Sequence, residues 1–284
     1  MNIAFLGMGL MGSRMSVRLL NAGFAVSVWN RTANAVEPLI TKGATHLTSL
    51  ENISSFQIIA LCLANDAAVQ SIAQTLLKNI QSHQIIIDFS SSSIELTQAL
   101  AAQATAKGAY WIDAPVSGGV MGAEQGTLVI FAGGDAEMIQ QLTPFFAPLS
   151  QRVTQMGNSG SGQATKICNQ LIVAATSTLI AEAIALAEKS GVDTTLLAPA
   201  LAGGFADSKP FQILAPRMAT QNFDPVQWKV QTLEKDLTNA INLATTHGLT
   251  LPVANRALQQ LNKHVKNGFA ANDLSSIIKV IESP

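Results

Sequence analysis

Apolar runs of strand length alternate with helical patterns through the first half of the chain. Six runs of this kind lie at residues 3–6, 25–29, 57–63, 84–88, 110–115 and 128–132. Helical periodicity occupies the stretches between them, at residues 13–20, 33–41, 66–77 and 94–106. Asp66 is the expected N-cap of the third helix. Strands that alternate with helices predict an α/β fold, a doubly wound, mostly parallel sheet with helices on both faces.

The pattern changes near Gly157. Residues 157–162 (GNSGSG) are rich in glycine and serine and predict a hinge or the start of a helix. Residues 163–189 then run without a helix breaker, enough for a helix of roughly 40 Å. All later segments are typical of helices joined by Gly and Pro connectors. We therefore predict an α/β domain over residues 1–160 and an all-α domain over residues 161–284, with one long helix at the junction.

Three glycines follow the first apolar run at a functional spacing. Gly7, Gly9 and Gly12 form G-x-G-x-x-G between a strand and a helix, the context that a dinucleotide-binding turn requires. Gly7 allows a tight turn, Gly9 lets the backbone approach a pyrophosphate, and Gly12 lets the helix pack on the strand. The helix N-terminus offers free N–H groups to the phosphates. The motif predicts that the first domain binds a dinucleotide cofactor.

The end of the second predicted strand bears on which cofactor binds. NAD enzymes of this fold usually carry Asp or Glu there, to bind the ribose 2′-OH. This chain has Asn30, Arg31 and Thr32 instead, so no acid repels a 2′-phosphate and Arg31 can pair with it. We predict a preference for NADP, with NAD possible. The alternative is that Asn30 and Arg31 form an ordinary solvated turn.

Three further segments carry candidate chemistry. Ser117, Gly118 and Gly119 follow a strand end, where a hydroxyl and two N–H groups can bind a carboxylate, or where a plain turn can lie. Lys166 and Asn169 are three residues apart and share a helix face among small and apolar neighbours. Such a lysine either reaches out to water or is held in a cleft for chemistry. Lys235-Asp236 is either part of a site or an exposed pair.

Composition narrows the classes of protein. The 284 residues are 48% hydrophobic and 12% charged with a net charge of −1, so no feature favours nucleic acid or an anionic membrane as a partner. The apolar helical part favours self-association, as a homodimer or homotetramer. We expect residues 171–187, which include Glu182, to fall short of a membrane span and form a buried helix. No pattern of residues indicates a metal site.

The cysteines and the first residues indicate a compartment. Cys62 and Cys168 both lie in apolar segments, which predicts buried thiols in a reducing environment rather than a disulfide framework. Met1 leads directly into the first strand without a basic region or a cleavage site. We expect a cytoplasmic location.

Four segments together resemble the β-hydroxyacid dehydrogenase family, which includes 3-hydroxyisobutyrate dehydrogenases, tartronate semialdehyde reductases and glyoxylate/succinic semialdehyde reductases. The segments are GMGLMGSRM from Gly7, DAPVSGGVMGAEQG from Asp113, GSGQATKICN from Gly160, and KDL from Lys235. They occur in the family's order and spacing and run through most of the chain. The resemblance implies a Rossmann domain, a long connecting helix and a helical domain that makes the dimer.

The resemblance also implies roles for individual residues. Lys166 matches the family's general acid/base, and Asn169 matches the residue that orients the substrate beside it. Ser117, Gly118 and Gly119 match the turn that binds the substrate carboxylate, with Asp236 and Trp228 also at the substrate. Semialdehyde reductases of the family often have Phe where this chain has Trp228. The larger ring would change the shape of the substrate pocket and therefore which substrate fits. The residues implied to contact the cofactor are Gly7, Met8, Gly9, Leu10, Met11, Gly12, Asn30, Arg31, Thr32, Leu63, Ala64, Ser91 and Lys235.

These observations together predict an NADP-dependent oxidoreductase that interconverts a small carboxylated semialdehyde or keto acid and its hydroxyacid. One alternative is an NAD-linked 3-hydroxyisobutyrate-type dehydrogenase acting in the oxidation direction. An imine reductase is a weaker alternative, because that family usually has Asp or Tyr where this chain has Lys166. A non-catalytic binding module would tend to lose the lysine. A decarboxylating 6-phosphogluconate-type enzyme would need a larger helical domain.

Overall fold

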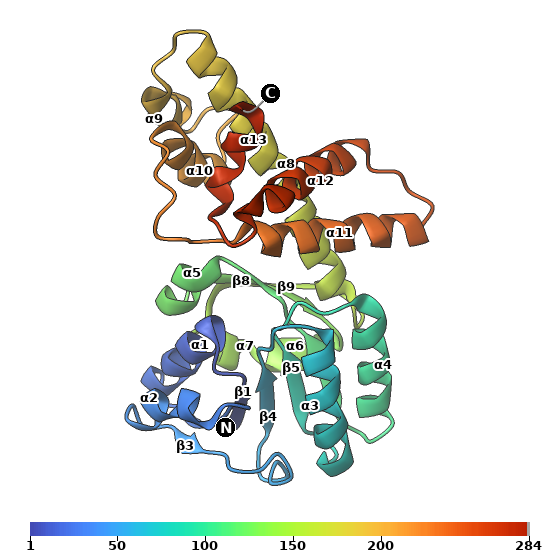
Figure 1. Ribbon diagram of the computed structural model, residues 1–284. Coiled ribbons are helices and arrows are strands. Elements are labelled where there is room, and N and C mark those ends of the chain that lie inside the picture. The colour runs from blue at the N-terminus through green and yellow to red at the C-terminus, as the bar shows by residue number, and fades with distance from the viewer. Residues whose placement is uncertain (283–284) are drawn as a thin grey trace. The chain divides into compact units, whose positions relative to one another are not determined.

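The chain divides into two compact units, at Lys166 and Ile167. The computed structural model describes residues 1–282 (Figure 1). The division falls inside helix α8 (Ser161–Lys189), whose first residues belong to the N-terminal unit and whose later turns belong to the C-terminal unit.

The N-terminal unit is built on a nine-stranded, mostly parallel sheet in the order β3-β2-β1-β4-β5-β6-β8-β7, with β9 paired to β8. β1 to β6 run parallel, and β8 is antiparallel to β6 and β7. This arrangement confirms the predicted doubly wound sheet. The strands are β1 (Asn2–Leu6), β2 (Ala25–Trp29), β3 (Thr45–His46), β4 (Ile58–Leu61), β5 (Ile85–Asp88), β6 (Tyr110–Asp113), β7 (Val116–Ser117), β8 (Leu128–Gly133) and β9 (Ser150–Gly157).

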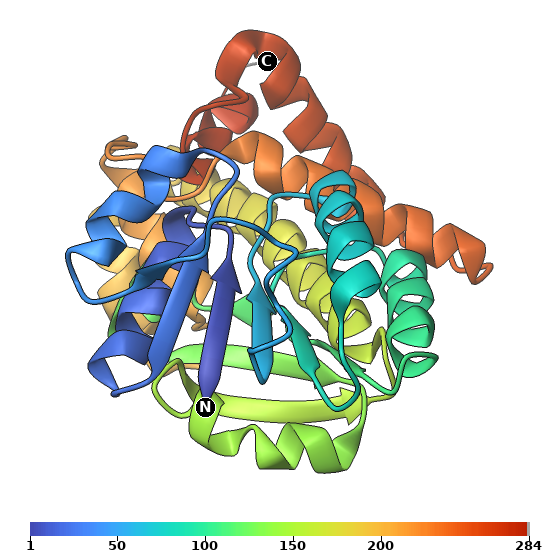
Figure 2. The same ribbon diagram turned by 90° about the horizontal axis from the view of Figure 1, so that it is seen from below.

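The continuous apolar runs are explained by burial of both sheet faces. Successive strand side chains point to opposite faces, so Ile3 and Phe5 pack in one core with α1, while Ala4 and Leu6 pack in a second core with α3. Figures 1 and 2 show α1 and α2 on one side of the parallel strands and α3 and α4 on the other. The helices of this unit are α1 (Leu10–Asn21), α2 (Glu37–Ile40), α3 (Asp66–Asn79), α4 (Ile94–Thr105), α5 (Gly119–Gln125), α6 (Ala136–Gln141) and α7 (Thr143–Phe146).

Several local predictions were wrong. Asn65, not Asp66, caps α3, because its Oδ1 accepts from Ala68 N at 3.0 Å. Asp66 is the first helical residue, and its carboxylate accepts from Ser93 N instead. The predicted helix over 33–41 is a 3₁₀ turn (Ala33–Val36) followed by the single turn of α2. Cys168 is exposed rather than buried, and Cys62 is partly buried.

The C-terminal unit is all-helical, as predicted. Its core forms where α10, α11 and α12 pack against the later turns of α8, around Phe211, Leu233, Leu237 and Leu261. Its other elements after α8 are the 3₁₀ turn η2 (Thr194–Leu196), α9 (Leu197–Leu201), α10 (Lys209–Ala219), α11 (Val230–Thr246), α12 (Pro252–His264), the π turn η3 (Val265–Phe269), the 3₁₀ turn η4 (Leu274–Ile277) and α13 (Ile278–Glu282).

Helix α8 is the one helix in the described part of the chain that is long and apolar enough to cross a membrane by these two criteria. This corrects the expectation that its apolar stretch falls short of a span. An 18-residue window of α8 has a mean hydropathy of 1.7, and 44% of this window is buried inside the protein. Core helices of soluble proteins meet the same criteria, so this feature is weak evidence for a membrane.

Candidate active site

The glycine-rich turn joins β1 to α1, and its geometry requires glycine at Gly7 and at Gly12. Gly7 has φ +101°, and a Cβ there would lie 2.3 Å from the carbonyl oxygen of Cys62. A Cβ on Gly12 would lie 2.0 Å from the carbonyl oxygen of Gly7, so α1 can approach the strand only without a side chain there. A Cβ on Gly9 would meet no protein atom within 4 Å. Packing within the protein therefore explains Gly7 and Gly12 but not Gly9, whose backbone fits the close approach of a pyrophosphate.

The loop after β2 is tied to this turn by the side chain of Asn30. Asn30 Oδ1 accepts from Met8 N at 3.0 Å, and Asn30 Nδ2 donates to the carbonyl oxygen of Thr32 at 3.0 Å. Arg31 and Thr32 are exposed on this loop. The N-cap of α1, Gly9, makes no side-chain capping bond, so the dipole and N–H groups of this helix end suit an anion. The residues present therefore fit a dinucleotide.

The other residues expected at the cofactor follow the neighbouring strands. Leu63 and Ala64 come after β4, and Ser91 comes after β5, at the same carboxyl edge of the sheet as the glycine-rich turn. Leu63 N donates to Ser90 Oγ at 2.9 Å, while Ala64 and Ser91 are exposed. β1 and β4 are the strands between which the chain order reverses, and dinucleotides bind outside such a point. Of the remaining candidates, Met8 is buried, Leu10 is exposed and Met11 is partly buried.

The Ser117–Gly119 turn links β7 to α5. Gly118 has φ +126° and Gly119 has φ +63°, a backbone region that favours glycine. Gly118 is the N-cap of α5, and Ser117 is the last residue of β7. The structure thus confirms that a turn after a strand lies at these residues, while its ligand stays a prediction.

Lys166 and Asn169 both lie on α8, and both are partly buried. Asn169 Nδ2 donates to Gln170 Oε1 at 2.9 Å, and Gln170 Nε2 donates to Asp236 Oδ2 at 2.5 Å. Asp236 Oδ1 lies 3.7 Å from Lys235 Nζ. In the C-terminal unit, the predicted residues Asn169, Lys235 and Asp236 are therefore brought together through Gln170, which is 4% exposed.

Lys235 and Asp236 differ in their surroundings. The Lys235 side chain is 52% exposed on α11, whereas that of Asp236 is 14% exposed. An ordinary exposed pair would have both side chains in water. The partly buried carboxylate with its partner Gln170 favours a site role for Asp236.

Trp228 precedes α11 and is held by a buried carboxylate. Asp273 Oδ2 accepts from Gln227 N at 2.7 Å and from Trp228 N at 3.3 Å, and Leu274 N donates to the Trp228 carbonyl at 2.8 Å. Asp273 also lies 3.4 Å from Arg217 Nε. The backbone at Trp228 is therefore fixed by contacts that do not involve its indole ring.

Two buried carboxylates, Asp88 and Asp113, end the neighbouring strands β5 and β6. Burial and the nearby charge of Asp113 raise the pKa of Asp88 to about 7, against hydrogen bonds from Ser90 and Ser92 that lower it. Burial also raises the pKa of Asp113, although the backbone N–H groups of Gly160 and Gln163 donate to it and oppose the shift. Both carboxylates therefore serve as hydrogen-bond acceptors inside the protein rather than as solvated charges.

Sequence reasoning missed several of these polar residues. Asp88 and Asp113 end the apolar runs QIIID and YWID, and a lone acid at the end of a buried strand is a signal that could have marked them. Gln163, Gln170 and Asp273 give no such signal, because each also has a partner that is distant in sequence: Ser90, Asp236 and Arg217, respectively.

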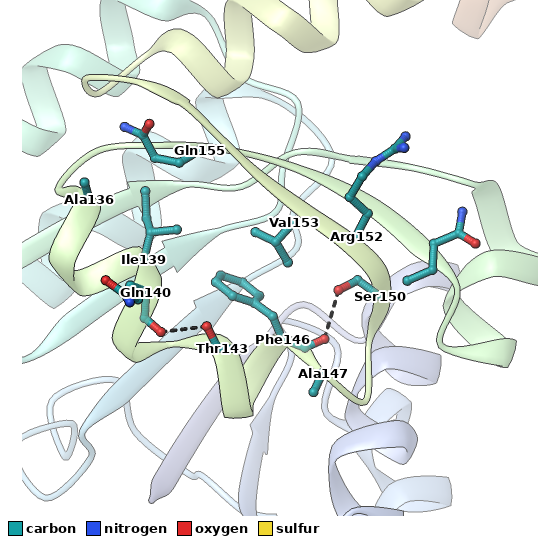
Figure 3. A pocket seen from close by; sticks show the side chains of 11 residues that line it. Ala136, Ile139, Gln140, Thr143, Phe146, Ala147, Ser150, Arg152, Val153 and Gln155 are labelled. Carbon is teal, nitrogen blue, oxygen red and sulfur yellow. Dashed lines mark hydrogen bonds between the residues drawn. The ribbon is translucent and has the colours of Figure 1, made fainter.

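A surface hollow of about 430 Å³ lies elsewhere, over α6, α7 and β9 (Figure 3). Ile139, Phe146 and Val153 line its floor, and Arg152 lies at its side. None of the predicted site residues lines it. Over residues 1–282, no three side chains of His, Cys, Asp or Glu gather in a way that could hold a metal ion.

Comparison with known proteins finds cofactor-binding families over both parts of the chain. Residues 2–157 match the NAD binding domain of 6-phosphogluconate dehydrogenase, and residues 160–281 match the NAD-binding family of NADP-dependent 3-hydroxyisobutyrate dehydrogenase. The 2-hydroxy-3-oxopropionate reductase of Escherichia coli is 31% identical over 286 residues, which cover 99% of this chain and 97% of that protein. Glyoxylate/succinic semialdehyde reductase 1 of Arabidopsis thaliana is 29% identical and is covered to 99%, as is this chain.

A solved structure extends the likeness to the fold. The 3-hydroxyisobutyrate dehydrogenase of Mycobacterium tuberculosis, with L-serine, superimposes with a TM-score of 0.91 at 28% identity over 99% of both chains. Together with these matches, the dinucleotide turn on a doubly wound sheet and the helical unit after it identify a nicotinamide-dependent dehydrogenase. The chain belongs to the β-hydroxyacid dehydrogenase family, and its activity is that of an NAD(P)-dependent hydroxyacid or semialdehyde dehydrogenase.

Proposed function

We propose that this protein is an NADP-dependent reductase of a small semialdehyde or keto acid that carries a carboxylate. The observation that carries the proposal is that one unit holds a pyrophosphate-type glycine turn, the Ser117–Gly119 turn and Lys166. The two named reductases among its relatives support the reduction direction. Arg31, exposed on the loop that Asn30 ties to the glycine turn, supports NADP.

In this proposal each residue has a separate task. The bound nicotinamide supplies the hydride. Lys166 gives a proton to the carbonyl oxygen as the hydride arrives at carbon, and takes it back in the reverse reaction. The Ser117–Gly119 turn holds the substrate carboxylate, and Asn169, oriented by Gln170, aligns the substrate. The family resemblance assigns Trp228 and Asp236 to recognition of the substrate and Lys235 to the cofactor.

A second candidate is a dehydrogenase that oxidises a 3-hydroxyacid with NAD. The superposition on the Mycobacterium tuberculosis 3-hydroxyisobutyrate dehydrogenase favours it. The two candidates share the same Lys166 chemistry and differ in cofactor and direction.

The test follows the consumption of NADPH and of NADH by the purified protein with glyoxylate and with the succinic, tartronate and methylmalonate semialdehydes. Fast NADPH oxidation with one aldehyde and little NADH oxidation would support the first candidate. A parallel assay of NAD reduction with 3-hydroxyisobutyrate and L-serine addresses the second. The proposed function fails if neither assay shows turnover.

The cofactor preference depends on Arg31. Replacing Arg31 with alanine removes a charge-assisted hydrogen bond of about 1.5–3 kcal/mol, so the Kd for NADPH should rise about 10- to 100-fold. The Kd for NADH, which has no 2′-phosphate, should change less than about threefold. Quenching of the cofactor's fluorescence measures both constants. Arg152→Ala, at an exposed arginine of the same unit, is the matched control. Equal losses for both cofactors would contradict the role of Arg31.

We also propose that the protein is at least a homodimer, associated through α8. Ile172, Leu179 and Leu186 are spaced seven residues apart on this helix and are 63–69% exposed. Residues at this spacing lie along one side of a helix, and an apolar stripe of this kind is typically covered by a partner.

A charge in the stripe should therefore dissociate the oligomer. Leu179→Glu is expected to halve the mass measured by light scattering at micromolar protein, since it buries an unpaired carboxylate in the interface. Leu249→Glu, at a leucine that is 61% exposed outside the stripe, should leave the mass unchanged. A monomeric wild type would refute the proposal.

A further inference from the structure

A buried glutamine near the start of α8 has both ends of its side-chain amide engaged. Gln163 is 1% exposed. Its Nε2 donates to the carbonyl oxygen of Ser90 at 2.8 Å, and its Oε1 accepts from Ser92 N at 3.1 Å. A neutral amide side chain can make both bonds at once, because its nitrogen donates and its oxygen accepts. The pair of bonds joins α8 to a loop 71–73 residues earlier in the chain.

The loop that Gln163 holds is the one after β5. Ser91 lies between the two residues that Gln163 contacts, and it is among the residues expected at the cofactor. Ser90 N donates to Asp88 Oδ1 at 2.9 Å, and Ser90 Oγ accepts from Leu63 N at 2.9 Å. The loop is therefore also bound to the segment after β4, which carries Leu63 and Ala64, both expected at the cofactor.

The backbone of Gln163 is anchored as firmly as its side chain. Asp113 Oδ2 accepts from Gln163 N at 3.0 Å, and Asp113 Oδ1 accepts from Gly160 N at 2.8 Å. A Cβ on Gly162 would lie 2.4 Å from the carbonyl oxygen of Phe131, so this first turn of α8 packs directly on the sheet. Lys166 follows Gln163 by three residues, less than one helical turn.

We propose that Gln163 is a positioning residue, which sets the place of the Lys166 amine relative to the cofactor-facing loop Ser90–Ser92. The inference rests on the proposed function, in which Lys166 is the general acid/base. Loss of the amide leaves α8 anchored by Asp113 but removes the direct link between the helix and the loop. Small misplacements of a catalytic group reduce the rate much more than they reduce binding.

The main test is a double-mutant cycle with Gln163→Met and Lys166→Met. Methionine keeps the length of the side chain but makes neither hydrogen bond, so kcat should fall about 10- to 100-fold. KM for the aldehyde and Kd for NADPH should stay within about threefold. In the Lys166→Met background the same change should have almost no further effect on kcat, because its contribution is exerted through the lysine. A merely structural role would lower kcat in both backgrounds.

Two further variants serve as controls for the double-mutant cycle. Gln103→Met makes the same chemical change at an exposed position of α4 and should behave as wild type. If Gln163→Met does not fold, Gln163→Leu repeats the cycle, because leucine also lacks both hydrogen bonds and is a shorter side chain that introduces no buried charge. Equal losses in the two backgrounds, or wild-type kcat in the Gln163 variant, would overturn the inference.

A second readout is independent of turnover and separates this inference from the proposed function. The rate at which acetic anhydride modifies Lys166 is measured by mass spectrometry with and without NADPH, with Lys189 as the internal control. NADPH should slow modification of Lys166 at least about fivefold in the wild type and less than about twofold in Gln163→Met. A wild type that reduces no aldehyde but shows this difference would refute the proposed function alone. Equal protection in both proteins, or none in the wild type, would refute the role of Gln163.

Discussion

Replacing Lys166 with methionine is expected to lower kcat by about 10²- to 10⁴-fold, the usual contribution of a positioned general acid/base. The alkoxide that forms when hydride reaches the carbonyl carbon needs a proton, and methionine has none to give. The assay uses the carboxylated aldehyde that the wild type reduces fastest. Cofactor binding is measured on the same samples and should be close to that of the wild type, since the glycine turn and Arg31 are unchanged.

The matched control is Lys189→Met, at an exposed lysine in the last turn of the same helix. It should keep the wild-type rate. The pH dependence of kcat/KM adds a second check, because the limb that reports the lysine should be absent in the Lys166 variant. Turnover within tenfold of the wild type would remove Lys166 from the mechanism while leaving the cofactor site intact.

Replacing Asp273 with asparagine is expected to lower the free energy of unfolding of the helical unit by about 3 kcal/mol. One carboxylate oxygen accepts from Ser275 N and Ser275 Oγ and lies near Arg217 Nε, while the other accepts from Gln227 N and Trp228 N. The amide group of asparagine must replace one of these oxygens and would face donors with another donor. It also leaves Arg217, whose side chain is 15% exposed, without its charge partner. Urea unfolding followed by circular dichroism measures the change.

The dependence on pH gives this prediction a second test. Burial acts to raise the pKa of Asp273, but hydrogen bonds from Ser275 and Gln227 and the charge of Arg217 outweigh it, and the pKa is lowered. A carboxyl with a depressed folded pKa stabilises the protein above its unfolded pKa of 3.8 and loses that contribution as the pH falls through the folded pKa. The difference between wild type and Asp273→Asn should therefore narrow below about pH 4.

Asp193→Asn is the control for the Asp273 substitution. Asp193 is exposed and caps the 3₁₀ turn η2, and asparagine caps equally well. Its cost should stay below about 0.5 kcal/mol. If Asp273→Asn lowered the free energy of unfolding by no more than Asp193→Asn does, the buried hydrogen bonds of Asp273 would add little to the stability of this unit.

The sequence was most informative where the cause of a structure is local. The strand at residues 3–6 and the glycines after it could be predicted because a run of apolar residues needs burial and because Gly7 must adopt a positive φ. The edge strand β9 was missed because five of its eight residues are exposed. Most of its residues are polar, so the segment lacks the alternation of apolar and polar residues that predicts a strand. The N-cap of α3 was misplaced by one residue because Asn65 and Asp66 are both good caps.

By itself, the sequence determined the fold class, the glycine turn and the order of the motifs, because each depends on residues close together in the chain. Only the tertiary structure decided which polar groups are partners across long separations. Gln163 meets Ser90 and Ser92, Gln170 meets Asp236, and Asp273 meets Arg217. The physical reason is that a buried polar group must find its hydrogen bonds wherever packing brings a partner, and periodicity along the chain records burial but not the partner.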